Sequence, residues 1–208
     1  MREVAPQPSE ATPGPGAWTG VAGALLAGHV LHGRYEIVRL LGAGGMSAVY
    51  EARDLRFPQA KRRCAVKEMS LAGQPALQGA TFEREIYILA SLSHPAIPKI
   101  YDFFQDGPRN YLVLELIEGQ NLEAVLAQKG PLPEQAVVRY AIEVCDVLEY
   151  LHSRRPEPIV FRDLKPANIM LAGQGHIMLV DFGIAKLLRK GVRGTMVGTE
   201  GYSPPEQY

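Results

Sequence analysis

The sequence has little cysteine and no excess of either charge. Cys64 and Cys145 are its only cysteines and lie far apart, which argues against a disulfide scaffold and favours a reducing compartment. Neither has the spacing of a metal-ligating pair. The 22 lysines and arginines balance 22 aspartates and glutamates, so no overall field selects nucleic acid. We therefore expect no nucleic-acid partner, and local sites must decide what the protein binds.

Long apolar runs are missing as well. No stretch reaches the roughly 18 apolar residues that cross a bilayer, and the N-terminus lacks the basic start and apolar core of a signal peptide. We expect a cytoplasmic segment with no membrane contact of its own, although a full-length parent could be membrane-anchored beyond residue 208. The hydrophobic share of 47% is enough for a real core.

Proline sets the N-terminus apart from the rest of the chain. Residues 1–16 hold four of the 16 prolines among small and polar residues, which offer too little apolar surface to offset the entropy of ordering. We predict a disordered or loosely packed arm over residues 1–32. Short β-type runs in residues 33–117 then predict a lobe of five antiparallel strands and one helix. The strands are expected at 35–41, 47–54, 63–69, 99–104 and 111–117, and the helix at 77–91.

Helical patterning dominates after Gly119. Pro133 suits a first helical turn, and the broad apolar stripe behind it predicts a helix over 134–152 that is buried on most sides. Short apolar runs then bracket the polar residues of "IVFRDLKPANIML" at 159–171. Because polar groups are costly to bury without partners, this cluster indicates a functional loop held between strands. Residues 118–208 form the second part of the chain.

A glycine-rich turn, "LGAGGMSAVYEA", follows the first of the expected strands. Gly42, Gly44 and Gly45 would let backbone N–H groups approach phosphate oxygens without a side-chain clash. A strand follows the turn, whereas a dinucleotide-binding turn is followed by a helix. On its own, the stretch is better explained as a plain glycine turn.

A lysine and a glutamate further along the sequence favour a phosphate-binding role over a plain glycine turn. Lys67 in "CAVKEM" lies on a strand that could carry its ammonium group under the glycine turn. Alone, it would be an ordinary exposed strand lysine. Glu85, however, shares a helix face with Phe82 and Leu89, which places a carboxylate on the inward side. A buried lysine needs such a partner.

The polar residues of the 159–171 loop, together with "VDFG" at 180–183, supply the groups that phosphoryl transfer requires. Asn168 and Asp181 offer hard oxygen ligands for Mg²⁺, or Mn²⁺, which bridges phosphates. Asp163 can accept the proton of an attacking hydroxyl, and Lys165 can offset negative charge on the transferred group.

Taken in order, these motifs resemble those of the eukaryotic-type (Hanks-type) serine/threonine protein kinases, and the wording "GYSPPEQY" is similar to bacterial members. The resemblance runs from Gly33 to Tyr208. It implies an α+β, protein-kinase-like two-lobe fold, with a five-stranded antiparallel N-lobe carrying helix C at 33–117 and an incomplete helical C-lobe at 118–208. It also implies transfer of the ATP γ-phosphate, with Mg²⁺, to protein serine and threonine hydroxyls.

The resemblance extends to individual residues. Asp163, Lys165, Lys67 and Glu85 would be catalytic, and Asn168 and Asp181 would hold the metal. Thr195 is the first candidate for a regulatory phosphosite in the activation segment, and Thr199 is the second. The implied ATP-binding residues are Leu41, Gly42, Ala43, Gly44, Gly45, Val49, Ala65, Lys67, Leu114, Glu115, Ile117 and Met170. Ser47, Phe161 and Pro204 depart from the usual motifs, but none of these changes removes a catalytic group.

The chain stops shortly after the activation segment, at Tyr208. Because family members continue with further helices that cover the 134–152 helix, we expect a fragment that is inactive alone. The implied partners are protein substrates and, for phosphorylation in trans, a second kinase molecule. Two alternatives stay open: a pseudokinase or ATP-binding scaffold, which keeps the fold without catalysis, and a small-molecule kinase of related fold.

Overall fold

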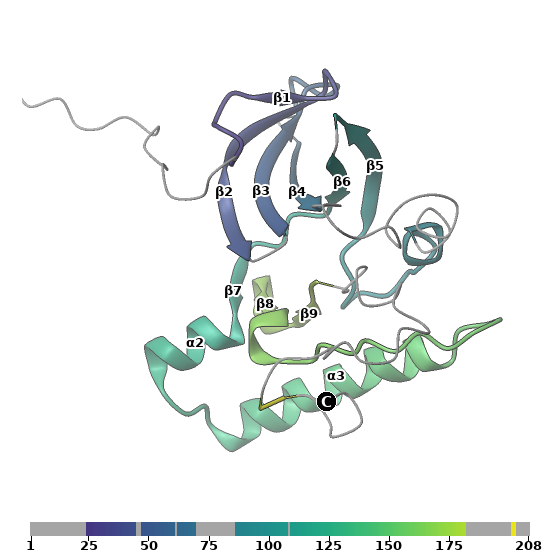
Figure 1. Cartoon of the computed structure of the whole chain (residues 1–208). Helices are drawn as coiled ribbons and strands as arrows, with labels where there is room; N and C mark the ends of the chain where they lie inside the picture. Colours follow the sequence, from purple (N-terminus) through teal and green to yellow (C-terminus); the bar gives the residue numbers. More distant parts are fainter. Residues whose placement is uncertain are drawn as a thin grey trace, which may run out of the picture.

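The computed structural model describes residues 24–44, 47–60, 62–69, 86–107, 109–181 and 201–202. Within these ranges the chain forms two lobes, an antiparallel sheet and a helical part with a second, smaller sheet (Figure 1). The predicted two-lobe α+β architecture is confirmed. The predictions for Gly45, Glu85, Thr195 and Thr199 fall outside the described residues.

The described residues of the upper lobe form a six-stranded antiparallel sheet in the order β1-β2-β3-β4-β6-β5. The sequence predicted five strands, and the additional one is β1, in which Leu31 pairs with Tyr35. Leu31 is buried, so this end of the predicted loose arm packs on the sheet. A strand of two residues is too short to show an alternating hydrophobic pattern, so only its pairing with β2 identifies it as a strand. The strands are β1 (Val30–Leu31), β2 (Tyr35–Gly44), β3 (Ser47–Asp54), β4 (Arg63–Met69), β5 (Ile100–Asp106) and β6 (Arg109–Leu114).

Alternation along the strands separates the core of this lobe from its functional face. Tyr50 and Ala52 of β3 and Val66 of β4 belong to a buried apolar cluster. Successive strand residues point to opposite faces, so Ala65 and Lys67, on either side of Val66, face the other way. The described end of the expected 77–91 helix, residues 86–90, is helical.

An ionic cluster joins the strands of this lobe at one end of the sheet. Arg34 donates hydrogen bonds to both carboxylate oxygens of Asp54, at 3.0 and 2.7 Å, and also pairs with Asp102. Asp54 is only 4% exposed. A carboxylate this deeply buried depends on such a bidentate partner, so Arg34 is a structural residue of the lobe.

In the part of the chain that the structure describes, the lower lobe contains two helices and a three-stranded sheet in the order β7-β8-β9 (Figure 1). Asn121 caps α2 by accepting a hydrogen bond from the N–H of Ala124 at 2.8 Å. Pro133 precedes α3 as expected, and α3 spans the predicted range. The elements are β7 (Gly119–Asn121), α2 (Leu122–Lys129), α3 (Glu134–His152), the 3₁₀ turns η2 (Pro166–Asn168) and η3 (Gly173–Gly175), β8 (Ile169–Ala172) and β9 (Ile177–Leu179).

Helix α3 is less buried than its broad apolar stripe predicts. Val147 and Leu151 are fully buried against the lower lobe. Val138 and Ile142, on another side of the helix, are 51% and 64% exposed. The described residues cover one face of α3 and leave the second apolar face open. None of the helices in the described ranges combines the length and apolar character needed to cross a bilayer.

Candidate functional site

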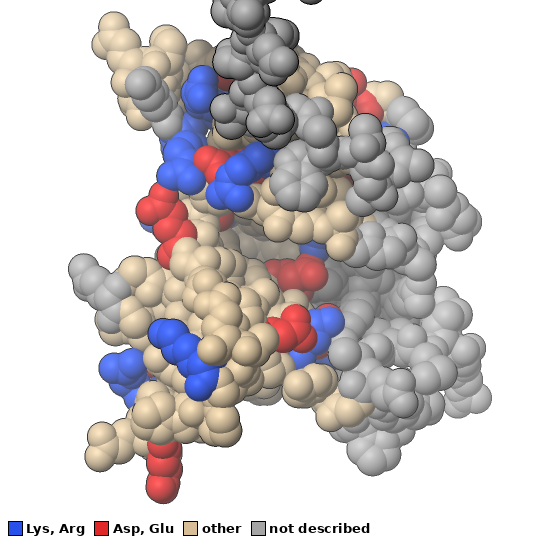
Figure 2. Space-filling model, turned by 90° about the vertical axis from the view of Figure 1, so that its left-hand side faces the viewer, with Lys and Arg blue, Asp and Glu red and all other residues tan. Residues whose placement is uncertain are grey.

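A cavity of about 810 Å³ lies between the two lobes. Figure 2 shows it as a hollow with acidic and basic side chains inside it and on its rim. The sheet, the connection between the lobes and the lower lobe all contribute to its lining. Among the residues predicted from the sequence, the cavity is lined by Leu41, Gly42, Val49, Ala65, Lys67, Leu114, Glu115, Ile117, Asn168, Met170 and Asp181.

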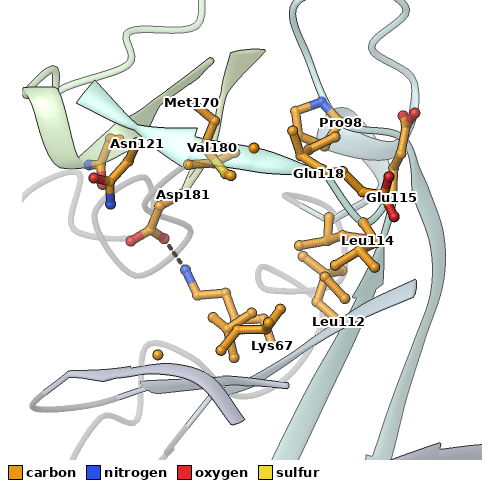
Figure 3. Close-up of a pocket in the computed structure, with 18 of the residues that line it drawn as sticks. Lys67, Pro98, Leu112, Leu114, Glu115, Glu118, Asn121, Met170, Val180 and Asp181 are labelled. Carbon is orange, nitrogen blue, oxygen red and sulfur yellow. Dashed lines mark hydrogen bonds and ion pairs between the residues drawn. The ribbon is translucent and has the colours of Figure 1, made fainter. Parts of the chain in front are cut away.

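Lys67 and Asp181 meet inside this cavity. The Lys67 ammonium group forms an ion pair with the Asp181 carboxylate across the two lobes (Figure 3). The side chain of Lys67 is 12% exposed, whereas that of Asp181 is 46% exposed. Asp181 has a φ of 61°, a conformation that L-residues seldom adopt outside special sites. The sequence predicted Glu85 as the partner of Lys67, and Glu85 lies outside the described residues. Among the described residues, Asp181 contacts Lys67.

The loop before β8 gathers the other predicted catalytic side chains. The Asn168 side-chain amide donates hydrogen bonds to the Asp163 carbonyl at 2.8 Å and to its carboxylate at 3.1 Å. The Lys165 ammonium group lies 3.4 Å from the same carboxylate. Arg162, which directly precedes Asp163, adopts a left-handed backbone conformation with a φ of 60°. Asn168 is buried and lines the cavity that Lys67 and Asp181 also line, so it connects Asp163 to that cavity.

The connection between the lobes begins where β6 ends, at Leu114. The Glu115 N–H donates to the Lys99 carbonyl at 2.8 Å, and the Glu115 carboxylate accepts from the Lys99 N–H at 3.2 Å. The other end of the connection is fixed by Gly119, whose φ is 155° and whose backbone lies directly against Leu171 of β8. The cavity wall formed by residues 115–118 is therefore held at both ends.

Four charged residues beside the cavity were not predicted from the sequence, and three of them, Arg39, Arg63 and Glu118, line it. Arg39 and Arg63 both bind the Glu51 carboxylate, at 2.8 and 2.6 Å, and Arg63 also pairs with Glu118. Glu51 is 4% exposed, and its hydrogen bond from Arg63 lowers the pKa of its carboxyl group. Arg39 and Glu51 occupy paired positions on neighbouring strands, but this pairing is known only once the register of β2 and β3 is known.

Not all predicted site residues line the cavity. Asp163 and Lys165 lie beside it, in contact with Asn168 or with each other. Ala43 pairs with Ala48 of β3 in the hairpin and is not among the described residues that line the cavity. Gly45 lies outside the described residues.

Comparison with known proteins agrees with this geometry. Residues 35–207 match the protein kinase domain. The chain belongs to the protein kinase family. Serine/threonine-protein kinase PknB of Mycobacterium leprae is 36% identical over 187 residues, 85% of this chain and 29% of that protein. Serine/threonine-protein kinase PknA of Nostoc sp. is 36% identical over 193 residues, 86% of this chain and 34% of that protein.

A solved structure shares the fold. The crystal structure of Rad53 1–466 in complex with AMP-PNP aligns with a TM-score of 0.63 at 26% identity, covering 73% of this chain and 38% of that one. The chain spans about a third of the length of the curated relatives named above.

Proposed function

We propose that this domain is a serine/threonine protein kinase, which transfers the γ-phosphoryl group of ATP to protein hydroxyl groups. One observation carries the proposal: Lys67, Asn168 and Asp181 line the same cavity, and Asn168 is hydrogen-bonded to Asp163. Cation, amide and carboxylates therefore converge on one site, as stabilisation of a triphosphate and activation of a hydroxyl require. The curated relatives bear the same activity in their names.

The adenine ring would lie against the connection between the lobes. Leu114 and Ile117 line this wall, and the N–H of Glu115 is already bonded to Lys99. The Glu115 carbonyl and the Ile117 N–H are the backbone groups that we assign to the adenine. Val49, Ala65 and Met170, which also line the cavity, would cover the two faces of the ring.

The phosphates would extend from the adenine toward Lys67, below Gly42 of the glycine-rich hairpin. The donor set suits Mg²⁺, because the Asn168 and Asp181 side chains offer oxygen ligands and Mg²⁺ takes its remaining ligands from phosphates and water. The described residues contain no cluster of three His, Cys, Asp or Glu side chains that would form a metal cage alone. A bound Mg²⁺ would neutralise phosphate charge.

Proton transfer from the substrate is assigned to Asp163. Its carboxylate is held by the Asn168 amide and lies 3.4 Å from the Lys165 ammonium group, which fixes its position. In this position Asp163 accepts the proton of a serine or threonine hydroxyl, and Lys165 offsets the negative charge of the transferred group. Thr195 and Thr199 stay predicted phosphosites, and phosphorylation of Thr195 by a second kinase molecule is part of the proposal.

Two measurements test the proposed function. Titration calorimetry of the 208-residue chain with Mg·ATP measures the nucleotide site. Radiolabel transfer from ATP to a generic protein substrate, measured with a version extended by the further helices of the family, tests catalysis. Loss of the general base in Asp163→Asn should lower transfer about 10² to 10⁴-fold while ATP still binds. Glu36→Gln, on the sheet surface, is the control.

The outcomes separate the alternatives. Transfer that depends on Asp163 supports a protein kinase. ATP binding without transfer by any version indicates a pseudokinase or scaffold. Absence of ATP binding, or wild-type transfer by Asp163→Asn, overturns the proposal. A panel of peptides and small-molecule alcohols as acceptors distinguishes a protein kinase from a small-molecule kinase.

A further inference from the structure

Four charged side chains form a continuous series of ion pairs from the sheet to the connection between the lobes. Arg39 on β2 contacts Glu51 on β3, Glu51 contacts Arg63 on β4, and Arg63 contacts Glu118, which directly precedes β7. Arg39, Arg63 and Glu118 all line the mouth of the cavity. The position of Glu118 beside the cavity is visible in Figure 3.

The two carboxylates that bind Arg63 in this series of ion pairs differ in exposure. The Glu51 side chain is 6% exposed, and it holds the guanidinium group of Arg63 through a hydrogen bond of 2.6 Å. The Glu118 side chain is 74% exposed and meets the opposite side of the same guanidinium group. Because Glu51 has already fixed Arg63, little further entropy is lost when Glu118 binds to it. The Arg63–Glu118 pair is therefore an exposed, weak and reversible link on a fixed base.

The Arg63–Glu118 pair joins the sheet to the connection between the lobes. Glu115 ties the start of the lobe connection to the Lys99 backbone, and Gly119 ties its end to β8 of the lower lobe. Arg63–Glu118 is the additional tie that runs from the sheet to the lower end of this connection. Breaking it would loosen the sheet against the lower end of this connection without disturbing either core, while the Lys67–Asp181 pair would still bridge the lobes inside the cavity.

We infer that Arg63 is a positioning residue, which binds Glu118 and thereby holds the nucleotide cavity at the width that suits ATP. The inference rests on the proposed function of the cavity. A molecule that opens more often presents a smaller binding-competent fraction, and its apparent affinity falls by that fraction. For an exposed ion pair, the expected loss of Mg·ATP affinity is about two- to fivefold.

A double-mutant cycle on the 208-residue chain tests this inference. Mg·ATP affinity is measured by calorimetry for wild type, Glu118→Gln, Arg63→Gln and the double variant. If the pair acts as one link, each single variant weakens binding and the double variant is no weaker than either one. Glu36→Gln is the matched control, because Glu36 pairs with Arg53 at 3.1 Å on the sheet alone and should keep wild-type affinity.

A second measurement does not depend on the folding of Arg63→Gln, which removes a partner from buried Glu51. The ratio of wild-type to Glu118→Gln affinity should fall toward one as salt is raised, because salt screens an exposed pair. Wild-type affinity in Glu118→Gln, effects that multiply in the double variant, or a ratio insensitive to salt would each overturn the positioning role. A wild-type chain that binds no nucleotide would instead overturn the proposed function itself.

Discussion

Replacing Gly119 by alanine should destabilise the protein through a clash with backbone. A Cβ atom at this position would lie 1.9 Å from the Leu171 carbonyl oxygen and 2.9 Å from its carbon, whereas ordinary contact begins at 3.4 Å. The obstacle is the backbone of β8, which pairs with β7 at this point through Ala172. One of the two strands would have to move by about 1.5 Å to admit the methyl group.

Two costs add up in this substitution. Overpacking typically costs about 1 to 3 kcal/mol. The φ of 155° at Gly119 adds strain for any L-residue, about 1 to 3 kcal/mol. We expect a total of about 2 to 6 kcal/mol, which lowers the melting temperature by roughly 4 to 24 °C in a chain of this size.

Thermal and urea unfolding followed by circular dichroism measure this loss. Gly173→Ala is the matched control, because Gly173 has no neighbour within 4 Å of an added Cβ and no left-handed φ. It should melt like the wild type. If Gly119→Ala melts at the same temperature as Gly173→Ala, then β7 does not approach β8 as described, and the anchor assigned to the lobe connection is wrong.

Three further predictions concern buried groups of the sheet lobe. Arg34→Ala removes both short hydrogen bonds to buried Asp54 and should lower the free energy of unfolding by about 3 to 5 kcal/mol in urea titrations; a loss within error would refute its structural role. A thiol reagent should label Cys145, which is exposed, and reach Cys64 only after denaturation, because burial raises the pKa of the Cys64 thiol to about 12; mass spectrometry of the native protein should find one label. The lowered pKa of Glu51 means that its carboxylate binds protons more readily in the unfolded state than in the native state. Wild type should therefore be more stable than Glu51→Gln, and this advantage is full above 4.5, the ordinary pKa of a glutamate. The advantage is lost as the pH falls through the pKa of Glu51 in the native state. Urea titrations of both proteins from neutral pH to about pH 3 measure that difference, and a constant difference would contradict the assigned ion pairs.

The sequence predicted the regular elements of the fold most successfully. The helix at 134–152 coincides with α3, because its apolar period is long and Pro133 precedes it. The strand expected at 111–117 instead occupies Arg109–Leu114, since the chain leaves the sheet after Leu114 to join the lobes. Alternation alone does not show where a strand loses its pairing partner.

Buried charges were the part that local patterns could not reveal. Glu51 and Asp54 lie in a strand where a charged residue ordinarily indicates the solvent face, yet both are 4% exposed. Their burial depends on arginines from other segments, Arg39 and Arg63 on neighbouring strands for Glu51 and Arg34 in the turn before β2 for Asp54, which only the assembled sheet brings together. The three residues of the proposed phosphate site, Lys67, Asn168 and Asp181, were singled out from their motifs and do line one cavity. Their roles in ATP binding are proposals that measurement must decide.

The central claim is that Asp181 and Asn168 place a metal ion on the triphosphate in the cavity that Lys67 lines. Calorimetry with ATP in Mg²⁺ and in EDTA, for wild type and Asp181→Asn, tests it most directly. We expect ATP to bind more tightly with Mg²⁺ in the wild type, and the difference between Mg²⁺ and EDTA to disappear largely in Asp181→Asn. An undiminished metal dependence in Asp181→Asn would contradict the central claim.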